Sequence, residues 1–204
     1  MATVGAVYDR AYSIEYLKAR GHRPRLPSRQ FICLDDRGKD EAAPYYFHYI
    51  DQTIGDNPLL LIREQLEDSM KLFSGITEDR SAFRYAPDKW SIRQVLNHIT
   101  DTERAFAFRT LWFARGFATA LPGYDPDIAA SGASADNVSW HRHVEEFRLV
   151  RLSTIALFEN MPEHRWQSTG VADNKQFTVL ALAYIIAGHV THHLTVLRER
   201  YLTR

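Results

Sequence analysis

The sequence predicts an all-α protein whose core is a four-helix bundle. Apolar residues recur every three to four positions in four segments of about 17 to 25 residues, the spacing of a helix with one buried face. These segments begin or end at capping residues, glycine or proline, and the sequence has no convincing strand repeat. Amphipathic helices of this length bury their apolar faces against one another, which favours a bundle.

The first 44 residues differ in composition from the rest of the chain. Residues 20–29 are basic and rich in proline, a composition typical of an irregular segment. We therefore expect an N-terminal extension over residues 1–44, followed by one domain over residues 45–204. Within the extension, the pattern allows a short helix over Val7–Arg20 and a strand over Gln30–Leu34.

Local signals place the ends of the bundle helices. Asn57 is an N-cap and Pro58 suits a first helical turn, while the second helix has either Ser91 or Asp88 as its cap. Gly116 ends that second helix. The four helices are predicted over residues 58–74, 92–115, 139–160 and 178–201. Residues 121–137, between the second and third helices, are rich in turn formers and too long for a simple connector, so they are predicted to be a crossover or a lid.

Composition narrows the classes of partner and the chemistry. The 204 residues contain 25 basic and 25 acidic residues, so the chain lacks the broad positive field that non-specific nucleic-acid binding requires. Neither nucleic acid nor a membrane is an expected partner. Cys33 is the only cysteine, which excludes an intramolecular disulfide and a four-cysteine zinc site. With no secretory signal and no run of about 18 apolar residues, a cytoplasmic location is expected.

Three of the nine histidines share helix faces with apolar residues. With successive residues placed about 100° apart, His189 and His193 fall within about 40° of each other on the apolar stripe of the fourth helix, and His192 lies on its shoulder. His98 lies on the apolar stripe of the second helix, in line with Thr102. Two imidazoles one helical turn apart can bind one ion, and a third from a facing helix completes three ligands.

Spacing alone leaves two interpretations of these histidines open. One is a metal site, because a cation would satisfy several buried imidazoles at once. The other is a set of hydrogen-bonded core histidines without metal. A zincin-type protease site is excluded, since that motif needs glutamate after its first histidine and this chain has Val190.

Several motifs resemble those of one family, in their order and in their spacing. They are the segments Tyr85–Ile92, His98–Arg104, Leu121–Asp127 and Ala181–Leu194. With these motifs, residues 45–204 resemble the DinB-like (DinB/YfiT) superfamily of metal-binding four-helix bundles. The chain departs from the family at Val190, where many relatives carry glutamate, and in the loop Ser131–Asp136.

The resemblance implies a function as well as a fold. It implies that His98, His189 and His193 bind a divalent metal ion, nickel or zinc, in a bundle with a long crossover, often a homodimer. It also implies one of two enzyme types acting on a small-molecule substrate. The favoured type activates a low-molecular-weight thiol for S-transfer to an electrophile, and the alternative is a hydrolase that uses a metal-bound water. A non-catalytic protein with a structural metal is a further alternative.

Polar neighbours of the histidines have both a functional and a structural interpretation. Asp101 could orient a ligand or accept a proton, or it could be a carboxylate on the helix surface. Arg109 could bind an anionic substrate or pair with a glutamate inside the bundle. Glu103 is expected on the polar side of the second helix, and His141 and His143 are expected to face solvent.

Overall fold

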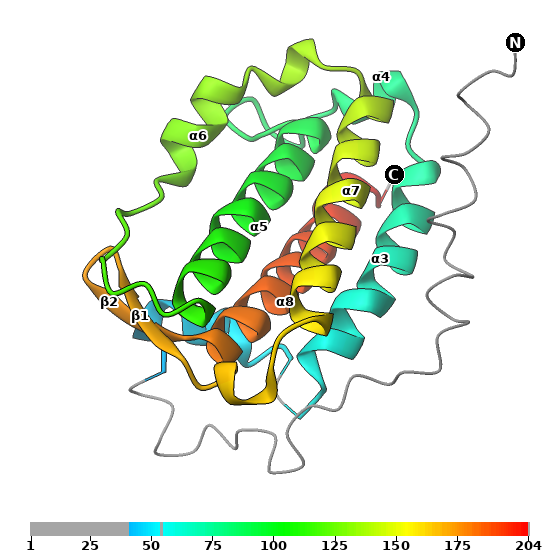
Figure 1. Ribbon diagram of the computed structural model, residues 1–204. Helices are drawn as coiled ribbons and strands as arrows, with labels where there is room; N and C mark the ends of the chain where they lie inside the picture. Colours follow the sequence, from blue (N-terminus) through cyan, green and yellow to red (C-terminus); the bar gives the residue numbers. More distant parts are fainter. Residues whose placement is uncertain (1–40, 54, 204) are drawn as a thin grey trace, which may run out of the picture.

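Four long helices form the bundle in the computed structural model, which describes residues 41–53 and 55–203 (Figure 1). They are α3 (Pro58–Ser74), α5 (Ile92–Ala114), α7 (Trp140–Glu159) and α8 (Val179–Val196). α3 and α5 each contact both α7 and α8, so each of the first two long helices packs between the last two. The predicted all-α bundle is confirmed. The helix and strand predicted in the extension, and Cys33, lie outside the described residues, and the boundary at residue 44 stays a prediction.

Shorter elements connect the long helices. η3 (Pro44–Tyr46) and α2 (Phe47–Ile50) precede α3, α4 (Glu78–Ser81) precedes α5, and α6 (Pro126–Ala133) and η4 (Ala135–Asn137) precede α7. η5 (Glu163–Arg165), β1 (Thr169–Ala172) and β2 (Lys175–Thr178) precede α8, which continues into η6 (Leu197–Tyr201), a π-helical turn.

The predicted helix ends are confirmed, and the capping contacts explain them. The Asn57 side chain accepts hydrogen bonds from the backbone N–H groups of the first turn of α3. Ser91 and Gln94 form a reciprocal capping box at the start of α5, so Ser91 rather than Asp88 is the cap. Gly116 has a φ of 81° just after α5, a conformation that glycine adopts without strain.

α8 is the central helix of the core. Every residue from Phe177 to Val190 is buried. The segment Val179–Tyr201 is long and apolar enough to cross a membrane, but 72% of its most apolar window is buried inside the protein. Packing in the bundle core accounts for that apolar composition. α2 crosses α8 at Gly188, where a β-carbon would overlap the carbonyl oxygen of Tyr49.

The crossover between α5 and α7 contains a helix that the sequence analysis did not predict. α6 packs against α5 (Figure 1). Asp125 caps α6 by accepting hydrogen bonds from the N–H groups of Asp127 and Ile128, at 2.9 and 3.0 Å. The end of the crossover is held by the buried Arg93, whose guanidinium donates to the carbonyl oxygen of Val138 at 3.1 Å.

β1 and β2 form one antiparallel hairpin between α7 and α8, which the sequence analysis also missed. Its two-residue turn, Asp173-Asn174, has φ values of 52° and 55°. Positive φ at both central residues suits the right-handed twist of a tight hairpin, and aspartate and asparagine tolerate it. Gly170 of β1 lies against the ring of Phe113, so the hairpin closes one end of the bundle.

Two predicted exposures are wrong. Glu103 is only 2% exposed, because α7 covers this side of α5 and places the fully buried Arg151 at 2.8 Å from the Glu103 carboxylate. His143 is 3% exposed, because the end of the crossover covers it and its Nε2 lies 2.8 Å from the carbonyl oxygen of Ala135. His141 is exposed, as predicted.

Candidate metal centre

The structure brings His98 of α5 together with His189 and His193 of α8. The Nε2 atom of His189 lies 3.1 Å from Nε2 of His98 and 3.1 Å from Nε2 of His193. One ligand nitrogen from each of the three rings lies within 4.8 Å of the other two. The one-turn spacing on α8 and the packing of α5 against α8 produce this convergence.

These distances fit a shared cation. Imidazole nitrogens bind zinc at about 2.0–2.1 Å, so two of them on one ion, at angles between octahedral and tetrahedral, are about 2.9–3.4 Å apart. Hydrogen bonds among the three rings satisfy their nitrogen atoms poorly. A ring nitrogen carries either one hydrogen or one lone pair, so Nε2 of His189 cannot form two well-directed hydrogen bonds at once. A divalent cation between the three rings would accept all three lone pairs.

Burial keeps the imidazoles in the neutral form that binds metals. His98 is 9% exposed, His189 is 3% exposed and His193 is half-buried. Burial lowers the pKa of His98 to about 4 and that of His193 to about 3, and it lowers the pKa of His189 well below its usual 6.5. All three rings are therefore neutral near pH 7, and a metal ion would displace no proton from them.

Neighbouring side chains hold the rings in place. The Thr102 hydroxyl, one turn after His98 on α5, lies 3.4 Å from His98 Nδ1. When Nδ1 carries the proton and donates to that hydroxyl, Nε2 presents its lone pair to the cluster. The rings of Trp90 and Tyr49 pack against His98 and His189, with centroid distances of 5.0 and 5.2 Å.

The other residues considered from the sequence lie outside the cluster. Asp101 accepts hydrogen bonds from Asn97 and Arg104, both at 3.0 Å. These contacts agree with a structural role for this carboxylate. The Arg109 guanidinium is buried over the rings of Phe106 and Phe177, and no described carboxylate forms an ion pair with it. The predicted glutamate pair is therefore absent from the described residues, and binding of an anionic substrate stays a prediction.

Sequence reasoning missed two residues of the crossover that lie near the cluster. The negative charge of Asp127 reaches His98 and raises its pKa, which partly opposes the effect of burial. The buried Tyr124 hydroxyl lies close enough to Thr102 to interact with it, but no described residue forms a well-aligned hydrogen bond with it. Both residues belong to the segment 121–137, which the sequence predicts only as a crossover or a lid, because its place against α5 depends on tertiary packing.

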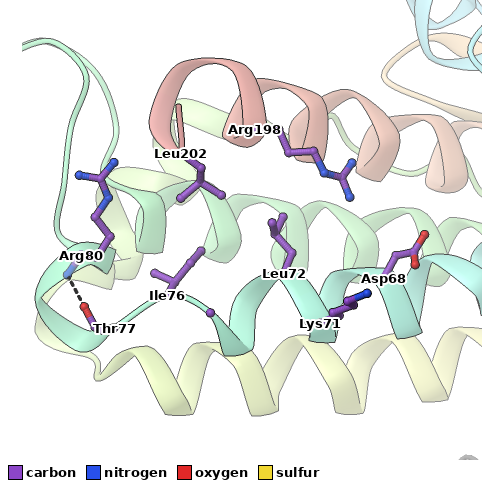
Figure 2. Close-up of a pocket in the computed structure, with 9 residues that line it drawn as sticks. Asp68, Lys71, Leu72, Ile76, Thr77, Arg80, Arg198 and Leu202 are labelled. Carbon is purple, nitrogen blue, oxygen red and sulfur yellow. Dashed lines mark hydrogen bonds between the residues drawn. The ribbon is translucent and has the colours of Figure 1, made fainter. Parts of the chain in front are cut away.

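A separate groove lies between α3 and the C-terminal end of the chain (Figure 2). Its volume is about 800 Å³, and its apolar side chains include Leu72, Ile76 and Leu202, with Lys71 and Arg198 along it. None of the three clustered histidines lines it. The groove is therefore separate from the candidate metal centre.

Comparisons with known proteins agree with the fold and identify the family. The family model of the DinB superfamily matches residues 61–197, a span that contains all three histidines. Among solved structures, the chain is similar to YfiT from Bacillus subtilis, described as a probable metal-dependent hydrolase with an unusual four-helix bundle topology. The similarity has a TM-score of 0.61 at 14% identity and covers 74% of this chain and 84% of YfiT, which shows a shared fold. No curated protein matches the chain. Because the family model spans most of the sequence, the chain belongs to the DinB superfamily.

Proposed function

We propose that His98, His189 and His193 bind one divalent cation, nickel or zinc, and that the protein is an enzyme acting on a small-molecule substrate. The observation that carries the proposal is the pair of 3.1 Å contacts from His189 Nε2 to the other two rings. Neutral imidazole nitrogens at this separation, two of them on buried rings and one on a half-buried ring, match a metal site better than a hydrogen-bonded group.

The number of protein ligands available favours catalysis over a purely structural role. Structural zinc sites usually have four protein ligands, whereas catalytic sites keep a position for water or substrate. No fourth histidine, cysteine or carboxylate joins the cluster in the part of the chain that the structure describes. A divalent cation held by three neutral imidazoles would keep its charge and would lower the pKa of a bound water or thiol towards neutrality.

We propose hydrolysis as the first candidate reaction, because YfiT is described as a probable metal-dependent hydrolase and has the same fold. Thr102 would orient His98 through Nδ1. The negative charge of Asp127, a carboxylate exposed on α6, reaches His98.

Thiol transfer is the second candidate, and Val190 favours it. Val190 is buried at the position where the family resemblance implies glutamate in many relatives, and the cluster contains no carboxylate of its own. A thiol has a pKa of about 8.5 before any activation, so it needs less help from a general base than water does. A low-molecular-weight thiol would lose its proton to solvent, and its sulfur would form a bond to an electrophilic carbon as the leaving group departs with its electron pair.

Metal analysis of the untagged protein tests the site. We expect about one equivalent of nickel or zinc in the parent and less than about a tenth of an equivalent in His98→Ala. His141→Ala, which removes an exposed histidine of α7, is the matched control and should keep its metal. A parent protein that takes up no divalent metal at all would contradict the proposal.

Activity assays then separate the two reactions. Substrate panels are measured with and without a low-molecular-weight thiol such as glutathione. Turnover without thiol supports hydrolysis, and turnover that requires thiol supports S-transfer. Either activity should disappear in His98→Ala, and equal activity in the variant and the parent would rule out the role assigned to the cluster. The homodimer, the cytoplasmic location and the expected absence of nucleic-acid and membrane partners stay predictions.

A further inference from the structure

Two more histidines, His192 and His48, follow the buried cluster towards the surface. His192 is half-buried, and its ring centroid lies 5.0 Å from that of His193. His48, on α2, is exposed, and its ring centroid lies 6.1 Å from that of His192. Exposure therefore increases step by step from His189 through His192 to His48.

Both outer rings offer nitrogen atoms that are free to bind a cation. His48 donates through Nδ1 to the backbone carbonyl oxygen of Tyr45, which leaves a lone pair on Nε2. Histidines that bind metal use the same arrangement, in which one ring nitrogen is fixed by a carbonyl group and the other is the ligand. His192 has no hydrogen-bond partner among the described residues, and its ring packs against those of His48, Tyr49 and His193.

Tyr49 fixes the position of this pair. The centroid of its ring lies 3.7 Å from the ring centroid of His48, 5.7 Å from that of His192 and 5.2 Å from that of His189. Tyr49 is itself held where α2 crosses α8, because Gly188 allows the two backbones to touch. Tyr49 thus contacts both outer histidines and His189 of the inner cluster.

We propose that His48 and His192 form an outer cation site through which the divalent ion reaches the inner cluster. This inference rests on the proposed function, because it assumes that the inner cluster binds metal. An ion must exchange its water ligands for protein ligands before it can enter a buried site. Two imidazoles near the surface would begin that exchange and bind weakly, and the three-histidine cluster would then bind the ion more tightly.

The rate of metal uptake tests the outer site. Metal-free full-length protein is mixed with Co²⁺ in a stopped-flow instrument, and loading is followed by the absorbance of the bound ion. His48→Gln and His192→Gln should each lower the loading rate constant about tenfold. Their equilibrium dissociation constants should equal that of the parent, because the inner ligands are unchanged. His141→Gln is the matched control and should load at the parental rate.

A rescue variant separates ligand chemistry from packing. His48→Asp removes the ring but keeps a ligand atom, so it should load Co²⁺ faster than His48→Gln. Equal loading rates in the parent and both glutamine variants would overturn the inference. A parallel loss of affinity in His192→Gln would also overturn it, because His192 would then be a ligand of the inner site. If the parent binds no Co²⁺, the proposed function fails, and the outer site fails with it.

Discussion

Replacing Arg151 with methionine should strongly destabilise the bundle, because Glu103 would lose its cation. The two side chains are 0% and 1% exposed, and Nη2 of Arg151 lies 2.8 Å from Oε2 of Glu103. These atoms are close but poorly aligned for a hydrogen bond, so Coulomb attraction holds the pair. Removing one partner of a buried pair costs about 3–5 kcal/mol. At about 2–4 °C per kcal/mol for a chain of this size, the melting temperature should fall by about 6–20 °C.

The double variant Glu103→Leu/Arg151→Met separates loss of the pair from exposure of a lone charge. It leaves no buried charge at this position, so its free energy of unfolding should be close to or above that of the parent. Gln65 loses the 3.3 Å hydrogen bond from Arg151 in both variants, so this loss cancels when they are compared.

pH adds an independent check on Arg151→Met. Burial raises the pKa of Glu103, and in the parent the charge of Arg151 opposes this shift. Without Arg151, the folded-state pKa lies further above the unfolded value, so the folded state binds a proton more readily. The difference in stability between parent and variant should therefore shrink as the pH falls from 8 to 5. Urea unfolding followed by circular dichroism measures it. A single variant within about 1 kcal/mol of the parent, or a double variant as unstable as the single, would refute the reasoning.

Three further predictions concern the metal centre and its support. Gly188→Ala places a β-carbon onto the Tyr49 carbonyl oxygen, so it should lower the free energy of unfolding by about 1–3 kcal/mol, measured by thermal unfolding. Gly132→Ala is the control, because its β-carbon meets nothing within 4 Å and should be tolerated. Equal effects of the two substitutions would contradict the close approach of α2 to α8. Thr102→Val should weaken metal binding about 10–100-fold in a competition titration, because it removes the hydroxyl that contacts His98. Thr102→Ser keeps the hydroxyl and should keep the parental affinity. An unchanged affinity in the valine variant would show that the hydroxyl does not support His98. The metal-free protein should lose stability as the pH falls from 6.5 to about 4, because an unfolded histidine gains a proton there and folded His98 does not. Measured by urea unfolding, the free energy of unfolding should change with pH by up to about 1.4 kcal/mol per pH unit for each such ring, and by less in His98→Ala. The same pH dependence in parent and variant would count against buried neutral histidines.

The long helices were predictable because their signals are local. A capping side chain acts on N–H groups two or three residues away, as Asn57 and Ser91 do here. Glycine ends a helix through its own φ, as at Gly116. The short elements gave weaker signals. The eight residues of α6 include few large apolar side chains, and each strand of the hairpin has four residues, too few to show an alternating pattern.

The burial of polar residues was less predictable, because a helical wheel locates one apolar face and says nothing of what covers the others. α5 contacts both α7 and α8, so more than one of its sides is buried. Glu103 lies on a side that periodicity assigns to solvent, and it is buried because Arg151 of α7 faces it. His143 is covered by Ala135, which belongs to a connector with no regular pattern. Both cases depend on contacts between distant segments.

The histidine cluster combines both kinds of information. The spacing of His189 and His193 fixes their common direction on α8, and this could be predicted locally. α8 is buried along most of its length, however, so an apolar stripe alone does not show which side meets α5. The close approach of α2 at Gly188 occupies one side of the helix, and α5 brings His98 to another. Three neutral imidazoles held in contact by this packing lose solvation that they do not regain from one another. Binding a cation would restore that loss, so metal content and stability should rise together in this bundle.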